Sequence, residues 1–150
     1  NNKKITLVHG DISPKNILIN NDKPIFLDAE CAWYGDPAFD FAFCINHLIL
    51  KSIKLPKVKD LLSKSFRILS DTYLMNVKWE DPKLFEKRTI LILSALMLAR
   101  IDGKSPVEYI NSNYEKQFIR SFAKSIIQNP INSLIDFSKK WFQNYIKNSI

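Results

Sequence analysis

Glycine is scarce in this sequence, with only three among 150 residues. Gly10 lies in a polar loop, Gly35 precedes an Asp-Pro pair, and Gly103 ends a predicted helix. A loop that wraps nucleotide phosphates in the manner of kinases needs several glycines close together. These 150 residues therefore contain no glycine-rich phosphate loop.

Cysteine and long apolar runs are also scarce. Cys31 and Cys44 show neither CxxC spacing nor the density of a secreted disulfide scaffold, so we expect two reduced, buried thiols in a cytoplasmic protein. The longest apolar run, around residues 90–99, is interrupted by Ser94 and falls short of the roughly 20 residues that span a bilayer. The N-terminus does not resemble a signal peptide, and we expect no membrane partner.

Charge is divided unevenly along the chain. The first 40 residues hold six acidic residues against four lysines, whereas the remaining 110 hold 18 basic and 9 acidic residues. The basic excess is mostly scattered lysine, which solvated helix faces explain better than a stripe that follows a phosphate backbone. We therefore expect no nucleic-acid partner.

The hydrophobic pattern predicts short strands followed by helices in one domain, residues 1–150. The segments ITLV (5–8), NILIN (16–20) and PIFLD (24–28) favour strands, and a turn at residues 21–23 joins the last two into a hairpin. Helices are predicted to begin at Asp36-Pro37, near Val58, at Asp81-Pro82, at the capping box Ser105-Pro106-Val107-Glu108, and at Asn129-Pro130. The fold class is α+β, a mostly helical body that carries a small β-hairpin.

The hairpin predicts a cation site if its register is known. When Asn20 pairs with Pro24 across a three-residue turn, Asn16 lies directly opposite Asp28. Opposed side chains on one face sit about 5 Å apart at Cβ, so an amide oxygen and a carboxylate could share one hard cation. Asp11 precedes the hairpin in a loop, where a carboxylate could act as a general base or orient an attacking hydroxyl.

Several of these residues also have ordinary structural interpretations. An isolated histidine such as His9 is more often structural than a ligand, and an aspartate before proline is usually a helix cap. Asn16 alone could close a turn, and Asp28 alone could cap a strand. Aromatic side chains are more often core than cofactor platforms, and cations at a helix C-terminus are favourable in any helix. The argument about aromatics favours a place in the core for Trp33 and Tyr34. The argument about helix ends favours a structural role for Arg100 and Lys104.

The run LVHGDISPKNILIN, followed by IFLDAECAWYGDPAFDFAF, closely resembles the catalytic core of the aminoglycoside phosphotransferase family, kinase-like enzymes that phosphorylate small molecules. The combination is specific: His-Gly-Asp, four residues, Asn, a hydrophobic strand ending in Asp-x-Glu, then Gly-Asp-Pro and Asp-x-Ala. The resemblance covers about residues 7–43, and the helical remainder looks like the C-terminal lobe of the family. The segment ARIDGKSPVEYI also resembles one found in family members.

The resemblance implies a separate role for each of the polar residues. Asp11 would be the catalytic base, Asn16 and Asp28 would hold the Mg²⁺ that accompanies the nucleotide, and Glu30 would assist the metal indirectly. His9 and Asp40 would be structural, with Asp40 anchoring the loop through hydrogen bonds, and Asp36 would cap the following helix.

The resemblance also implies a kinase-like C-terminal lobe that transfers phosphate from ATP to a hydroxyl group of a small molecule. The glycine loop and the strand lysine of such an enzyme would lie in an N-terminal lobe, which we expect upstream of this chain. The alternative is a non-catalytic, truncated remnant or binding module with the same fold. Because the helical part is net basic, a neutral or anionic hydroxyl compound is favoured over a cationic aminoglycoside, and choline-like, sugar-like and amino-alcohol substrates all stay open.

Overall fold

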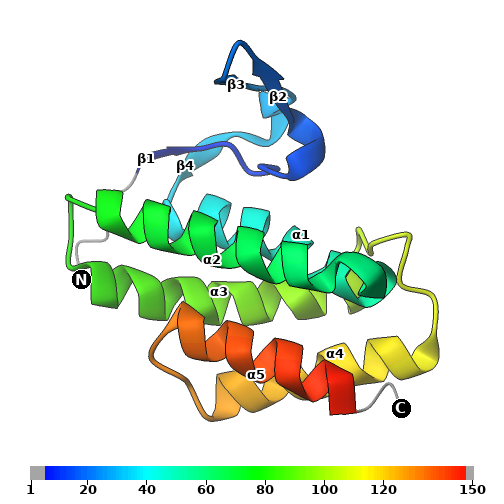
Figure 1. Ribbon diagram of the computed structural model, residues 1–150. Helices are drawn as coiled ribbons and strands as arrows, with labels where there is room; N and C mark the ends of the chain where they lie inside the picture. Colours follow the sequence, from blue (N-terminus) through cyan, green and yellow to red (C-terminus); the bar gives the residue numbers. More distant parts are fainter. Residues whose placement is uncertain (1–5, 148–150) are drawn as a thin grey trace.

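The computed structural model describes residues 6–147 as a helical bundle with a small β region on one side (Figure 1). The helices of this part of the chain are α1 (Ala38–Lys54), α2 (Lys59–Asn76), α3 (Pro82–Asp102), α4 (Asn113–Gln128) and α5 (Leu134–Lys147). The strands are β1 (Thr6–Val8), β2 (Ile17–Asn20), β3 (Lys23–Phe26) and β4 (Trp33–Gly35). Single 3₁₀ turns occur at Pro14–Asn16, Ala29–Cys31 and Pro56–Val58. The predicted class, a mostly helical body with a small hairpin, is confirmed.

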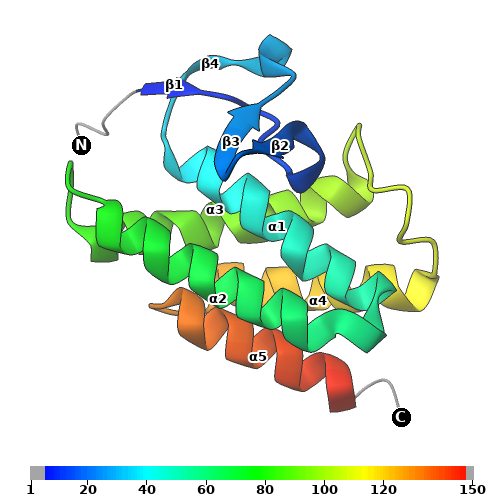
Figure 2. The same cartoon turned by 45° about the horizontal axis from the view of Figure 1, so that its top comes forward.

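The helices pack around α1, which lies against both α2 and α3. Helix α4 covers the other side of α3, and α5 packs on α2 (Figures 1 and 2). Within residues 6–147, no helix combines the length and the apolar character that crossing a membrane requires.

The core is built from apolar side chains that recur at helical spacing. Phe41, Ile45 and Ile49 of α1 belong to the same buried cluster as Leu93 and Met97 of α3, and all five are 2% exposed or less. Burying each such side chain contributes about 1.5–3 kcal/mol. The bundle therefore fixes the start of α1, which carries residues of the candidate site.

One polar contact inside the core ties the last helix to the first. The indole nitrogen of Trp141 in α5 donates to the Ser52 hydroxyl of α1 at 3.0 Å, and that hydroxyl donates to the Ile49 carbonyl at 2.6 Å. Trp141 is fully buried. Its polar atom is thus satisfied without contact to water.

The β2–β3 hairpin forms as predicted, but its register differs by one residue. Asn20 pairs with Lys23 rather than with Pro24, so the turn has two residues, Asn21 and Asp22. Both turn residues have positive φ, 48° and 61°, as a two-residue hairpin turn requires, and Asn and Asp tolerate this conformation better than most residues. The three-residue turn and the register derived from it are wrong.

The β region contains a second strand pair that the sequence did not predict. Strand β1 pairs antiparallel with β4, with Leu7 opposite Tyr34. The ITLV strand is confirmed from Thr6 onward, and Ile5 lies outside the described residues. Trp33 and Tyr34 are 41% and 77% exposed, so their expected place in the core is wrong.

The cysteines are both free, but only one is shielded from solvent. Cys44 in α1 is half-buried, as expected, whereas Cys31 is exposed on the turn before β4. The prediction of a buried thiol is therefore wrong for Cys31. Burial of the Cys44 thiol, with the nearby Asp40 carboxylate, raises its pKa to about 11.

The first three predicted helices are confirmed, and the fourth begins later than predicted. Asp81 caps α3 by accepting from the Lys83 backbone nitrogen at 2.9 Å, and Gly103 follows its last residue. The capping box at residues 105–108 does not start a helix, because α4 begins only at Asn113. Instead Val107 donates its backbone N–H to the Arg100 carbonyl at 2.8 Å and buries its side chain, which fixes a non-helical path.

The last helix also begins later than the Asn129-Pro130 pattern predicts. Asn129 is the C-terminal cap of α4, and α5 starts at Leu134. Ser133 caps it: its hydroxyl accepts from the Asp136 backbone nitrogen at 3.1 Å and donates to the Asp136 carboxylate at 2.8 Å. Two possible N-cap residues, Asn129 and Ser133, lie four residues apart, and the chain uses the second.

Candidate active site

The polar loop between β1 and β2 is held from a distance by one carboxylate of α1. Asp40 accepts the backbone N–H of His9 at 2.7 Å and that of Gly10 at 2.9 Å, one on each carboxylate oxygen. Hydrogen bonds to an ionised acceptor are the stronger kind. The anchoring role that the resemblance implied for Asp40 is confirmed.

His9 shapes the loop through both of its ring nitrogens. Nε2 lies 2.9 Å from the Leu27 carbonyl oxygen, which can only accept, so Nε2 carries the proton. Nδ1 then accepts from the Asp11 backbone N–H at 3.3 Å. The ring therefore links the loop to the segment after β3, and the structural role expected of His9 is confirmed.

Gly10 is required by the backbone at this point. Its φ is +84°, which side chains rarely adopt, and a Cβ there would lie 2.3 Å from the Cys31 carbonyl oxygen. The loop and the turn before β4 thus approach too closely for any other residue.

Asp11 and Asn16 are directly bonded to each other. The amide nitrogen of Asn16 donates to the Asp11 carboxylate oxygen Oδ2 and to the Asp11 backbone carbonyl, both at 2.9 Å. The Lys15 ammonium lies 3.4 Å from the same Oδ2. Asn16 is buried, whereas the Asp11 side chain remains 25% exposed. The loop thus presents a positioned, solvent-accessible carboxylate.

The structure changes the geometry expected for the cation ligands. The Asn16 carbonyl accepts from the Leu27 N–H at 2.9 Å, so Leu27 rather than Asp28 is its neighbour across the hairpin. Asp28 follows with φ of 64°, which turns the chain out of the strand. The expectation that Asn16 lies directly opposite Asp28 is wrong. Their role as Mg²⁺ ligands, and that of Glu30, stays a prediction.

The donor chemistry of these residues nevertheless suits a magnesium ion. Asn16 gives its amide nitrogen to Asp11, so its amide oxygen is the atom that remains for a cation. Asp28 and Glu30 are exposed carboxylates. Within residues 6–147 no cluster of three or more His, Cys, Asp or Glu side chains forms a metal cage. Mg²⁺ commonly binds one or two protein oxygens together with water and substrate phosphates, so a full cage is not required.

A cleft of about 680 Å³ opens beside the candidate base. Gly10 and Asp11 form one wall of the cleft, and Arg100, Lys104 and Glu108 form part of the other. Arg100, in the last turn of α3, and Lys104, just after that helix, therefore both lie at the cleft. The volume is in the range of small-molecule sites.

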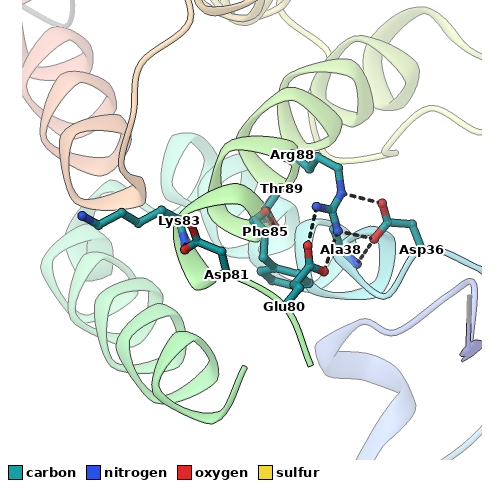
Figure 3. Close-up of polar contacts among 8 residues, drawn as sticks. All are labelled: Asp36, Ala38, Glu80, Asp81, Lys83, Phe85, Arg88 and Thr89. Carbon is teal, nitrogen blue, oxygen red and sulfur yellow. Dashed lines mark hydrogen bonds and ion pairs between the residues drawn. The ribbon is translucent and has the colours of Figure 1, made fainter. Parts of the chain in front are cut away.

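Arg88, a residue that the sequence did not single out, fixes the turn that leads into α1 (Figure 3). Its guanidinium bonds both oxygens of Asp36, at 2.7 and 3.0 Å, and both oxygens of Glu80, at 2.7 and 2.8 Å. Asp36 also caps α1 by accepting the Ala38 N–H at 3.0 Å, as predicted. Because Asp40 lies in the first turn of α1, this network holds the helix that anchors the loop.

The region that carries this geometry is similar to known phosphotransferases. A sequence model of the Phosphotransferase enzyme family matches residues 2–52. The resemblance drawn from the motifs is confirmed for this segment, which includes the loop, both strand pairs and most of α1. No curated protein and no solved structure matches the chain.

Proposed function

We propose that this chain is the catalytic C-terminal lobe of a kinase-like phosphotransferase, which transfers the γ-phosphoryl group of ATP to a hydroxyl group of a small molecule. The observation that carries the proposal is Asp11, a partly exposed carboxylate held at the edge of the 680 Å³ cleft by Asn16 and by the anchored loop. A base that must meet an incoming hydroxyl needs such access and such fixed geometry.

In the proposed reaction, Asp11 accepts a hydrogen bond from the acceptor hydroxyl and takes its proton as the new O–P bond forms. The bond between the γ-phosphorus and the bridging oxygen breaks, and ADP leaves. Asn16 and Lys15 both contact Oδ2 of Asp11, which leaves Oδ1 for the acceptor. Mg²⁺, held by Asn16 and Asp28 with help from Glu30, would supply charge neutralisation on the phosphates.

The proposal includes an N-terminal lobe that covers the hairpin. Support comes from the large apolar side chains that β2, β3 and the residue after them expose: Leu18, Ile19, Ile25, Phe26 and Leu27 are between 39% and 68% exposed. Exposed apolar patches of this kind usually mark a surface that another part of the protein or a ligand covers. An in-frame glycine-rich loop and a strand lysine encoded upstream would support this part of the proposal.

The direct test is phosphate transfer from labelled ATP to a panel of hydroxyl compounds by the full-length protein. We expect Asp11→Asn to lower turnover by about 10²–10⁴-fold, because the amide cannot accept the proton. Asp22→Asn is the matched control: it makes the same change in the exposed hairpin turn, where asparagine also tolerates positive φ. Unchanged turnover in Asp11→Asn, with circular dichroism showing retained folding, would refute the assigned base.

A further inference from the structure

A second hollow, of about 380 Å³, lies next to the cleft. Its walls come from four separate segments and include Ser13 and Lys15 of the site loop, His47 of α1, Arg100 of α3, and Tyr109. We call this space the basic hollow. Lys15 and Arg100 line both the basic hollow and the cleft that holds the candidate base, so the two spaces adjoin.

Polar atoms without partners gather in the basic hollow. The Ser13 hydroxyl, His47 Nε2, Arg100 Nε and the Tyr109 hydroxyl are buried and have no hydrogen-bond partner among the described residues. Ser13 is 1% exposed and His47 is 7% exposed. Buried polar atoms in folded proteins are almost always bonded, so a set of unbonded ones around one space calls for partners from outside the chain, such as water or a ligand.

Three of these four atoms, those of Ser13, Arg100 and Tyr109, can donate hydrogen bonds. An arginine Nε can only donate, and serine and tyrosine hydroxyls can donate to an acceptor ligand. Burial raises the pKa of Tyr109 to about 12, so its hydroxyl keeps its proton at neutral pH. A ligand with several acceptor oxygens offers the kind of partner that these donors lack.

The charge of the walls points in the same direction. Lys15, Lys51 and Arg100 contribute three positive charges, whereas Glu108 contributes one negative charge. Burial is the largest cause that lowers the pKa of His47, and the charges of Arg100 and Lys51 lower it further, to about 4. The imidazole is therefore neutral when the hollow holds no anion. Asp11 opposes this shift only weakly, since the cations outweigh it.

We propose that the basic hollow binds the anionic group, a phosphate or a carboxylate, of an acceptor molecule whose hydroxyl lies at Asp11. This inference rests on the proposed function for the reacting end of the molecule, but the anion site itself is defined by the residues of the hollow. The substrate class is then a small hydroxyl compound that already carries a negative group, which the net positive walls favour over a cationic amino-alcohol.

The anion site can be tested without ATP, by nuclear magnetic resonance on the full chain. Only two histidines occur, so the imidazole signals of His47 and His9 are easily separated. Inorganic phosphate is titrated against sodium chloride at the same ionic strength. We expect phosphate to shift the His47 signal saturably and to raise the pKa of His47 from about 4 toward its ordinary value, because a bound anion favours the imidazolium.

Variants locate the site. Arg100→Gln should weaken phosphate binding about tenfold or more, because it removes a charge-assisted donor. Arg120→Gln is the matched control, since Arg120 pairs with Asp102 on the exposed surface and does not line the hollow. If Arg100→Gln does not fold, Lys51→Gln takes its place, with a weaker but measurable loss. An equal shift with chloride, or unchanged phosphate affinity in these variants, would overturn the proposal.

Competition identifies the ligand class and separates this inference from the proposed function. Glycerol 3-phosphate and glycerate should displace phosphate, whereas glycerol and choline should not; displacement by choline would overturn the assignment. Phosphate binding without any phosphate transfer from ATP would refute the proposed function and leave the anion site. Transfer to neutral acceptors without phosphate binding would refute the anion site and leave the function.

Discussion

Replacing Arg88 by methionine should destabilise the protein more than the same replacement of Arg120. Methionine keeps the apolar stem and removes the four hydrogen bonds to Asp36 and Glu80. The two carboxylates then face each other without the cation that separates them. The side chains of Arg88, Asp36 and Glu80 are between 17% and 22% exposed.

The magnitude follows from that exposure. Removing one partner of a fully buried ion pair costs about 3–5 kcal/mol, whereas exposed pairs contribute about 0–1 kcal/mol. A network that is about one-fifth exposed and doubly bidentate lies between these limits, so we expect a loss of about 2–3 kcal/mol in the free energy of unfolding. For a domain of this size that is a large part of the total stability.

Arg120→Met is the matched control for this prediction. Arg120 also makes a two-point contact, with Asp102, but the two side chains are 31% and 47% exposed. Its loss should destabilise the protein far less than the loss of Arg88, because exposed ion pairs contribute little to stability. The two variants therefore differ in the burial of the network and in its second carboxylate, not in the type of substitution.

Urea unfolding followed by tryptophan fluorescence measures both variants, since the chain has three tryptophans. Linear extrapolation at equal slope gives the difference in free energy of unfolding. Adding Glu80→Gln to Arg88→Met should restore part of the loss, because one stranded carboxylate becomes neutral. If Arg88→Met unfolds within about 0.5 kcal/mol of Arg120→Met, the network does not hold α1 as argued.

Two further predictions concern the loop and the thiols. Asp40→Ala should lower the rate of phosphate transfer while the protein stays folded, because the His9 and Gly10 N–H groups lose their acceptor and the loop loosens. Equal turnover in the variant and the unmodified protein would contradict the anchoring role. With iodoacetamide at pH 8, Cys31 should react first, because the pKa of Cys44 is about 11 and only about a thousandth of that thiol is ionised. Cys44 should become reactive as the pH rises toward 11, which mass spectrometry of the alkylated peptides would show.

The sequence predicts local features well where one short segment decides them. The hairpin, the cap Asp81 and the helix stop at Gly103 each depend on residues within a few positions of one another. The register error shows the limit, because Asn21-Asp22-Lys23 fits a turn of two or three residues. The two-residue turn forms when Asn21 and Asp22 both adopt positive φ. Their residue types permit this conformation but do not require it.

Tertiary contacts override local signals elsewhere. Residues 105–108 satisfy the capping-box pattern, yet Val107 and Ile110 are 6% and 1% exposed and belong to the core cluster, which the observed non-helical path allows. Burying two aliphatic side chains outweighs a capping interaction of about 1 kcal/mol. Arg88 could not be linked to Asp36 from sequence, because 52 positions separate the two partners.

The candidate site likewise has one part that local sequence predicts and another that depends on tertiary contacts. Asp11, Asn16 and Lys15 contact one another within a single short loop, so motif spacing suffices to find them. The basic hollow is different, since it needs the loop, α1, α3 and the segment after α3 to meet. The candidate base is therefore readable from the sequence, whereas the walls of the proposed acceptor site form only when the helices pack. The charge of those walls can change through substitutions on α1 or α3 without touching the loop, so the candidate base and the proposed acceptor site are separable in this fold.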